Sequence, residues 1–195
     1  MRLSEARHWV FDMDGTLTVA VHDFDAIRRA LEIPPQDDIL AHLAALPAER
    51  AAPKRAWLLE HERALAEAAQ PAGGAAELVR ALCERGCRLG LLTRNAHELA
   101  LITLQRIGLD DCFRSDDVLG RDEAPPKPDP GGLLHLAAAW DVAPAHLVMV
   151  GDHHHDLECA RAAGAYGVLV NQPANPWPEL SDRYVRDCFE LLAQL

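Results

Sequence analysis

The chain has 195 residues, of which 49% are hydrophobic and 25% are charged, which is the composition of an ordinary globular protein. It excludes a disordered, collagen-like or low-complexity chain, and the apolar runs are far shorter than the ~20 residues that span a bilayer. A formal net charge of −11 argues against nucleic acid or an anionic membrane as the main partner.

The N-terminal part of the chain predicts one strand followed only by helices. The run over residues 8–13 is apolar and β-rich, whereas the segment 19–72 has helical periodicity throughout. Pro34-Pro35 and Pro47 divide this segment into three helices, because proline interrupts a helix. We expect the third of these helices over residues 53–69.

Strands and helices alternate from residue 73 onward. The pattern predicts strands at 88–93, 117–119, 147–151 and 166–171, and helices at 75–84, 97–107, 133–140, 157–163 and 179–192. Such alternation predicts an α/β fold, a Rossmann-like doubly wound parallel sheet with helices on both faces. Because the helical segment interrupts it, we expect a core domain of residues 1–18 and 73–195 with an inserted small all-α cap domain of residues 19–72.

The cysteines and the N-terminus bear on the compartment. The five cysteines form no CxxC pair, and we expect reduced, mostly buried thiols: Cys83, Cys87, Cys112, Cys159 and Cys188. The first residues lack the apolar core and cleavage site of a signal peptide, so we expect a cytoplasmic protein. The sequence does not indicate an oligomeric state.

Two carboxylates follow the first predicted strand. In open α/β sheets ligands bind beyond the carboxyl ends of the strands, and Asp12 and Asp14 stand at such an end. Side chains two apart on a strand share a face, so both are expected to project into one crevice. Two carboxylates held together suit a hard divalent cation, or a nucleophile with an acid/base partner.

Polar residues also follow the second core strand and the proline-rich loop. Thr93, Arg94 and Asn95 precede a helix, where a hydroxyl and backbone N–H groups can bind phosphate oxygens; the structural alternative for Thr93 is a helix N-cap. Lys127 is one of only two lysines, and the prolines around it restrict its backbone. The alternative for Lys127 is a solvated surface side chain.

The strand at 147–151 is followed by the segment GDHHHD. Gly151 permits a tight turn that places Asp152 where a metal ligand is needed, and Asp156 lies four residues further on. The three histidines between them are consecutive and lack the i, i+4 spacing of helical zinc ligands. We therefore expect them in a solvated loop or at the rim of a substrate site.

These segments, in this order and spacing, resemble the motifs of the haloacid dehalogenase superfamily. The resemblance is nearest to its phosphoglycolate phosphatase-like subgroup, which carries a small helical cap. It covers nearly the whole chain and rests on DMDGTLT at 12–18, LLTRN at 91–95, PKPDP at 126–130 and GDHHHD at 151–156.

The resemblance implies a role for each matching residue. Asp12 would be the nucleophile that forms an aspartyl-phosphate, and Asp14 the acid/base that protonates the leaving oxygen and then activates water. Thr93 and Lys127 would bind the phosphoryl group, with Arg94 and Asn95 contributing to substrate binding. Mg²⁺ would be held by Asp12, Asp152 and the backbone carbonyl of Asp14, and Asp156 would support the metal's water shell or Lys127.

The second aspartate decides between reactions. By the resemblance, dehalogenases lack Asp14, since a halide leaves without a proton, whereas an alkoxide gains ~10²–10⁴-fold from a general acid. This favours a phosphatase acting on a small phosphorylated metabolite. A phosphomutase of the β-phosphoglucomutase type and a catalytically silent binding protein with this fold remain alternatives.

The cap should choose the substrate. Of Arg28 and Arg29, adjacent on one helix, only one is expected to face the cleft. Lys54, the only lysine of the cap, is expected on the surface of a helix. Arg121, six residues before Lys127, either approaches the site or forms a surface ion pair.

Overall fold

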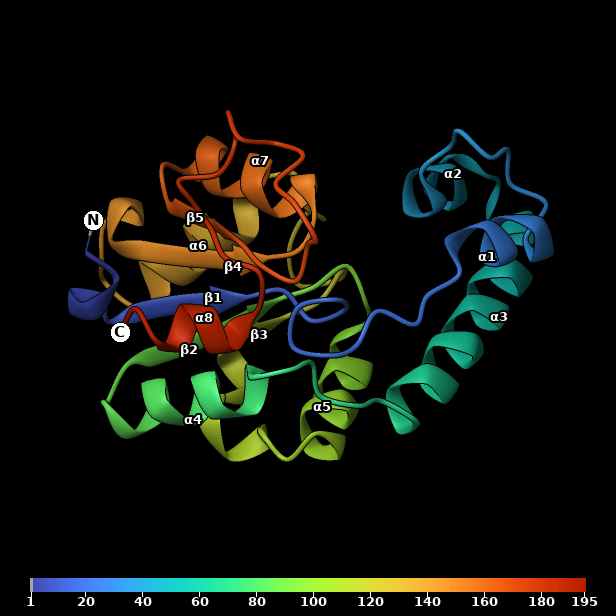
Figure 1. The fold of residues 1–195 in the computed structure, drawn as a ribbon. Helices are drawn as coiled ribbons and strands as arrows, with labels where there is room; N and C mark the ends of the chain where they lie inside the picture. The colour runs from blue at the N-terminus through green and yellow to red at the C-terminus, as the bar shows by residue number, and fades with distance from the viewer. Residues whose placement is uncertain (1) are drawn as a thin grey trace.

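A computed structural model, which describes residues 2–195, contains one six-stranded sheet (Figure 1). All its strands are parallel, in the order β3-β2-β1-β4-β5-β6. The strands are β1 (His8–Phe11), β2 (Arg88–Leu92), β3 (Val118–Leu119), β4 (Leu147–Gly151), β5 (Tyr166–Leu169) and β6 (Arg183–Tyr184).

Helices cover both faces of this sheet. They are α4 (Ala75–Glu84), α5 (His97–Arg106), α6 (Gly131–Ala139), α7 (His154–Ala163) and α8 (Cys188–Leu192), with short 3-10 turns at Leu3–Glu5, Asp110–Cys112, Ser115–Asp117 and Pro144–His146. Trp9 and Phe11 of β1 pack into a core with α4, α5 and α8, whereas Val10 packs into a second core with α6 and α7. This alternation along a buried strand confirms the doubly wound α/β fold.

Three helices form a block beside the sheet: α1 (Phe24–Ala30), α2 (Ile39–Ala45) and α3 (Ala48–Glu67). Figure 1 shows the block beyond the end of the sheet at which β1 leads into its loop. The block has its own small core, to which each helix contributes a buried side chain, such as Ile27, Leu43 and Leu58. It is joined to the rest of the chain where α3 packs against α5, with Ala66 against Leu99.

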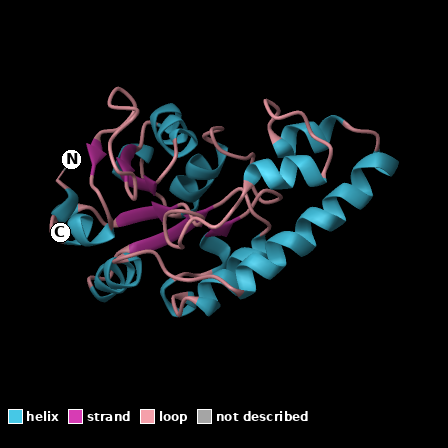
Figure 2. Cartoon of the chain, turned by 45° about the vertical axis from the view of Figure 1, so that its right-hand side comes forward, coloured by secondary structure: helices cyan, strands magenta, loops and turns pink. Residues whose placement is uncertain are grey.

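The long helix α3, which Figure 2 shows along its whole length, begins five residues before the expected position. Pro47 precedes it as predicted, but Pro53 lies inside it. The fixed φ of proline is compatible with a helix, and only one backbone hydrogen bond is lost. The boundary therefore depends on the packing of the block rather than on Pro53.

The C-terminal tail differs from the expectation of one helix over 179–192. Residues Arg183–Tyr184 instead form β6 beside β5, and the helix is confined to α8. Asp182 accepts a hydrogen bond from the backbone N–H of Gly167, and the N–H of Val185 donates to the carbonyl of Leu169. Pairing with the open edge of the sheet thus prevails over local helical periodicity.

The cysteines are free thiols in the described residues, in line with the expected reduced state. The expectation that most are buried is wrong, because only Cys159 and Cys188 are buried and Cys83 is exposed. No helix within residues 2–195 has the length and apolar character needed to cross a bilayer.

Candidate active site

A cavity of about 270 Å³ lies between the carboxyl ends of β1, β2 and β4 and the helical block. All eight residues that the sequence singled out for chemistry line it: Asp12, Asp14, Thr93, Arg94, Asn95, Lys127, Asp152 and Asp156. The cavity therefore joins three strand ends and the proline-rich loop, at the place where α/β sheets bind ligands.

The loop after β1 brings the first two carboxylates to the cavity. From the sequence, Asp12 and Asp14 were expected on one face of the strand. The strand ends at Phe11, however, so both lie on a turn beyond it. The carbonyl of Met13 accepts from the N–H groups of the following turn. Gly15 has φ +87°, and a Cβ there would lie 2.4 Å from Oδ2 of Asp152, so this turn requires glycine.

Lys127 lies at the centre of the site and is only 3% exposed. Its Nζ is 2.5 Å from Oδ1 of Asp12 and 2.6 Å from Oδ1 of Asp156. Burial opposes the charged form, but the two carboxylates outweigh it and raise the pKa of Lys127. The lysine is therefore a fixed positive charge between two carboxylates, not a surface side chain.

The acidic groups around Lys127 exceed the positive charge available to them. Carboxylate oxygens of Asp12, Asp152 and Asp156 lie within 4.8 Å of one another, and the Thr16 hydroxyl is 3.2 Å from both Asp12 and Asp152. Burial, together with the neighbouring carboxylates, raises the pKa of Asp152 to about 8 and also raises that of Asp12. A cluster of oxygen ligands whose negative charge is not fully balanced suits a hard divalent cation such as Mg²⁺.

The cluster contains the carboxylate of Asp156, which the expected ligand set of Asp12, Asp152 and the backbone carbonyl of Asp14 does not include. The side chain of Asp156 belongs to it and that of Asp14 does not, among the residues described. Asp156 is already bonded to Lys127 and accepts from the backbone N–H of His153 at 3.0 Å. Its contacts therefore match the expectation that it supports Lys127.

Asp14 faces another part of the cavity. Its Oδ1 is 3.7 Å from Nδ1 of His22, whose ring stacks on Phe24 at the start of α1. Burial, with a further contribution from the charge of Asp12, raises the pKa of Asp14 to about 7. A carboxyl group with such a pKa is partly protonated near neutral pH, as a proton donor must be.

Thr93 and Asn95 shape the loop after β2. The Thr93 hydroxyl accepts from the N–H of Asn95 at 3.1 Å, and Oδ1 of Asn95 accepts from the N–H of Ala96 at 2.8 Å. The N-cap of α5 is Ala96, so Thr93 is not a helix cap. Its hydroxyl proton remains available for a ligand in the cavity.

Arg94 connects this loop to two other elements. It forms an ion pair with Asp38, the N-cap of α2, and its Nη1 is 3.0 Å from Nδ1 of His155 on α7. Burial and the guanidinium of Arg94 lower the pKa of His155 to about 4, so its neutral ring can accept from Arg94. Asp38 could not be identified from the sequence, because nothing in its spacing relates it to residue 94.

The three histidines were expected in a loop or at a substrate rim. They lie at the start of α7 rather than in a loop. His153 is the N-cap and accepts from the N–H of His155, while Asp156 accepts from the N–H of His153. His153 and His155 line the cavity, as expected of a substrate rim. Ring nitrogens of the three, including His154, lie within 4.8 Å of one another, but these contacts occupy Nδ1 of two of them.

The basic residues of the helical block, and Arg121 of the core loop, have separate contacts. Arg28 lines the cavity and Arg29 does not, which confirms that one of this pair faces the cleft. Arg121 forms an ion pair with Glu62 of α3, and its Nη1 is 2.9 Å from each carboxylate oxygen. The pair is largely buried and connects the core loop to the block. Lys54 is bonded to Glu32 and to the Leu31 carbonyl and lies outside the cavity.

Comparisons with known proteins identify the family of the chain. The family model of haloacid dehalogenase-like hydrolases matches residues 7–164. A haloacid dehalogenase-like hydrolase domain-containing protein of Arabidopsis thaliana is 34% identical over 182 residues, covering 87% of this chain and 73% of its own. A phosphoglycolate phosphatase of Chromobacterium violaceum is 29% identical over 195 residues, covering 87% of each chain.

The crystal structure of a hydrolase from Pseudomonas syringae has the same fold. It matches with a TM-score of 0.77 and 23% identity and covers 96% of both chains. The chain belongs to the haloacid dehalogenase-like hydrolases. It is a hydrolase of the subgroup similar to phosphoglycolate phosphatases.

Proposed function

We propose that the chain is a Mg²⁺-dependent phosphatase that hydrolyses a small phosphomonoester through an aspartyl-phosphate. One observation carries this proposal: a single cavity holds Asp12, bonded to buried Lys127, and Asp14, whose pKa burial raises to about 7. The Lys127 ammonium favours the ionised form of Asp12, as a nucleophile requires, whereas Asp14 has the pKa that an acid/base requires. The similarity to proteins named phosphoglycolate phosphatase supports the same reaction class.

In the first step an oxygen of Asp12 attacks phosphorus, and the bond from phosphorus to the leaving oxygen breaks. Asp14 donates its proton to that oxygen, which leaves as an alcohol. The Thr93 hydroxyl and Lys127 hold the phosphoryl oxygens, since phosphoryl transfer depends on positioning and charge neutralisation. Arg94 and Asn95 complete the binding of the substrate.

In the second step Asp14, now a carboxylate, takes a proton from water, which attacks the phosphorus of the aspartyl-phosphate. Inorganic phosphate leaves, and Asp12 and Asp14 return to their starting states. Asp156 acts through Lys127. Its Oδ1 is 2.6 Å from the Lys127 ammonium and holds that group toward Asp12.

We assign the Mg²⁺ site to Asp12, Asp152 and the backbone carbonyl of Asp14. The excess of buried carboxylates over cations supports this assignment. Bound Mg²⁺ would neutralise carboxylate and phosphoryl charge, so that two anions can meet.

We further propose that residues 19–72 act as the cap that encloses the substrate. The cavity of about 270 Å³ has one wall formed by α1 and α2 of this segment, with Arg28 and Ile39 facing it. A site of this size admits a metabolite and not a folded protein.

The test is phosphate release from p-nitrophenyl phosphate with Mg²⁺ or with EDTA, in the wild type and in Asp12→Asn. The proposal expects release that requires Mg²⁺ and is abolished by the substitution. Asp110→Asn, a conservative change on a surface turn, is the matched control and should be fully active. Metal-independent release, or an active Asp12→Asn enzyme, would contradict the proposal.

A further inference from the structure

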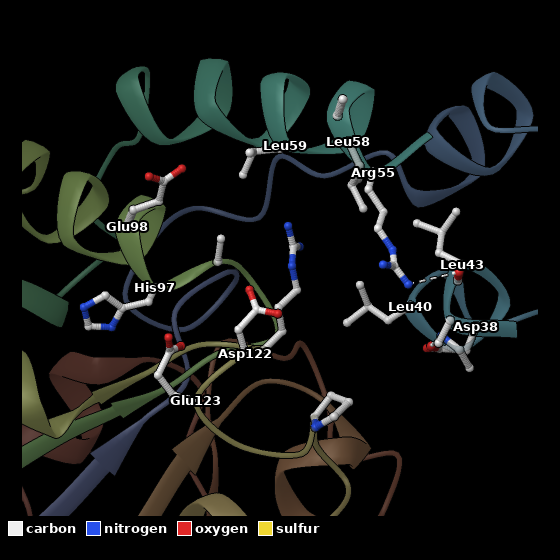
Figure 3. A pocket seen from close by; sticks show the side chains of 16 residues that line it. Asp38, Leu40, Leu43, Arg55, Leu58, Leu59, His97, Glu98, Asp122 and Glu123 are labelled. Atoms are coloured by element: carbon white, nitrogen blue, oxygen red, sulfur yellow. Dashed lines mark hydrogen bonds between the residues drawn. The ribbon is translucent and has the colours of Figure 1, made fainter. Parts of the chain in front are cut away.

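A second and larger cavity, of about 790 Å³, adjoins the candidate active site (Figure 3). It lies between α2 and α3 on one side and the start of α5 and the core loop after β3 on the other. Three residues line both cavities: Asp38, Leu40 and Leu58. Because these side chains line both cavities, the two cavities are separated there by a single layer of side chains.

The wall formed by the helical block is apolar. Leu40 and Leu43 of α2 and Leu58 and Leu59 of α3 face this second cavity, and Figure 3 shows them gathered on the side of these helices. Ligand sites are concave and mostly apolar, with a few polar groups that fix orientation. This wall therefore suits the hydrocarbon part of a ligand.

Arg55 supplies a polar group beside Leu40 and Leu43 (Figure 3). Its side chain runs from α3 into the second cavity, where Nη2 donates to the carbonyl of Leu43 at 3.2 Å (Figure 3). Within residues 2–195 no carboxylate lies at ion-pair distance from Arg55. A guanidinium has five N–H donors, so most of its hydrogen-bonding capacity is left for an anionic group.

The boundary between the two cavities is formed by an ion pair on one side and by a half-buried leucine on the other. Glu62 lines the first cavity and Arg121 the second, and their ion pair closes the space between α3 and the core loop. Leu40, in contrast, is only half-buried near the start of α2, so its side chain can change rotamer without opening a core. A leaving group longer than the first cavity would pass at Leu40.

We propose that the second cavity binds the distal part of the leaving group, so that the preferred substrates are elongated phosphomonoesters. Their leaving group has an unbranched apolar body and a terminal carboxylate bound by Arg55. This inference rests on the proposed phosphatase function and specifies its substrate class. The reacting phosphate stays among Asp12, Thr93 and Lys127, while the chain crosses Leu40.

The experiment compares ethyl, butyl, hexyl and octyl phosphate and the corresponding ω-carboxyalkyl phosphates. In the wild type, kcat/KM should rise roughly threefold for each methylene that enters the second cavity, through a lower KM. A terminal carboxylate should add a further roughly tenfold at the length that reaches Arg55. Arg55→Gln should remove the carboxylate gain and keep the methylene gain.

A matched pair of variants tests the location. Ala56→Trp adds bulk from an exposed position that lines only the second cavity, whereas Ala52, also exposed on α3, lines neither cavity. Ala56→Trp should abolish the gain with chain length and leave ethyl phosphate hydrolysis unchanged. Ala52→Trp should behave as the wild type, and titration calorimetry with octylphosphonate should give the same ranking without turnover.

The outcomes separate this inference from the proposed function. If ethyl phosphate is hydrolysed but longer esters gain nothing, or if Ala56→Trp and Ala52→Trp behave alike, the inference is wrong and the phosphatase stands. If no ester is hydrolysed with Mg²⁺ and octylphosphonate does not bind, both are wrong.

Discussion

The sheet edge at which the carboxyl ends of β1, β2 and β4 meet differs from the helical block in how its polar side chains are held. At the sheet edge, Asp12, Lys127 and Asp156 are buried and bonded to one another, on loops anchored by parallel strands. The block has its own core, and ion pairs join it to the rest of the chain: Arg121–Glu62 and Arg94–Asp38 from core loops, and Arg63–Glu98 from α5. The sheet edge therefore holds the reacting groups of the proposed reaction, whereas our proposal assigns access and the choice of substrate to the block.

After the complete loss of activity expected of Asp12→Asn, the largest effect is expected at Asp14, at the sheet edge. Asp14→Asn removes the proton donor, so kcat for ethyl phosphate should fall by ~10²–10⁴. p-Nitrophenyl phosphate should lose less in its first step, because its leaving group needs no proton. The values of kcat/KM for both esters, which report the first step, measure the difference; an equal loss on both would contradict a general acid acting on the leaving oxygen.

The same residue predicts a pH dependence. The donor must be protonated, and burial raises the pKa of Asp14 to about 7. The first step for ethyl phosphate should therefore slow as pH rises through 7, and this descending limb should be absent in Asp14→Asn. Single-turnover rates between pH 5.5 and 8.5 test it.

A smaller loss is expected at Lys127. Lys127→Met leaves Asp12 and Asp156 without their shared cation, and removal of one such charge-stabilising group costs ~10²–10³ in kcat. Asp156→Asn keeps the lysine and should be affected less. Equal losses in the two variants would show that the ammonium acts only through its packing.

Breaking the connection to the block should affect stability more than chemistry. Arg121→Ala leaves Glu62 largely buried without its partner, which should lower the free energy of unfolding by ~2–3 kcal/mol. Adding Glu62→Gln should restore part of this loss. Denaturant unfolding measures both variants, and an Arg121→Ala loss below ~0.5 kcal/mol would mean that the pair contributes no more than a surface ion pair.

The stability of the metal-free site should depend on pH. Burial raises the pKa of Asp14 to about 7 and that of Asp152 to about 8, above the ordinary 3.8, so the folded state holds protons that the unfolded chain releases. In EDTA, stability should therefore fall as pH rises from about 4 to about 8. Mg²⁺ should raise Tm more at pH 8.5 than at pH 5.5; the reverse trend would contradict the excess of carboxylates.

The sequence predicted the sheet edge well for a physical reason. Asp12, Thr93 and Asp152 follow strands whose apolar patterns are local, and parallel strands bring their carboxyl ends together. The contact of Arg121 with Glu62 could not be predicted, because 59 positions separate the two and neither belongs to a pattern. The second cavity, likewise, exists only through the packing of the block against the core.

The boundaries of β6 and α7 were missed for different reasons. Strand β6 forms by pairing with a distant edge, which local periodicity does not encode. The start of α7 had a local signal, because Asp156 lies three residues after His153 and closes a capping box. Histidine is not among the preferred N-cap residues, so that signal was easily passed over.

The most direct test of the central claim is to trap the phosphoryl group on the sheet edge. The wild type with Mg²⁺ and p-nitrophenyl phosphate is quenched in acid within one turnover, digested and examined by mass spectrometry. The account predicts one added phosphoryl group on the peptide that contains Asp12, and none in Asp12→Asn. Turnover with phosphate on another residue, or with no covalent intermediate at any quench time, would contradict it.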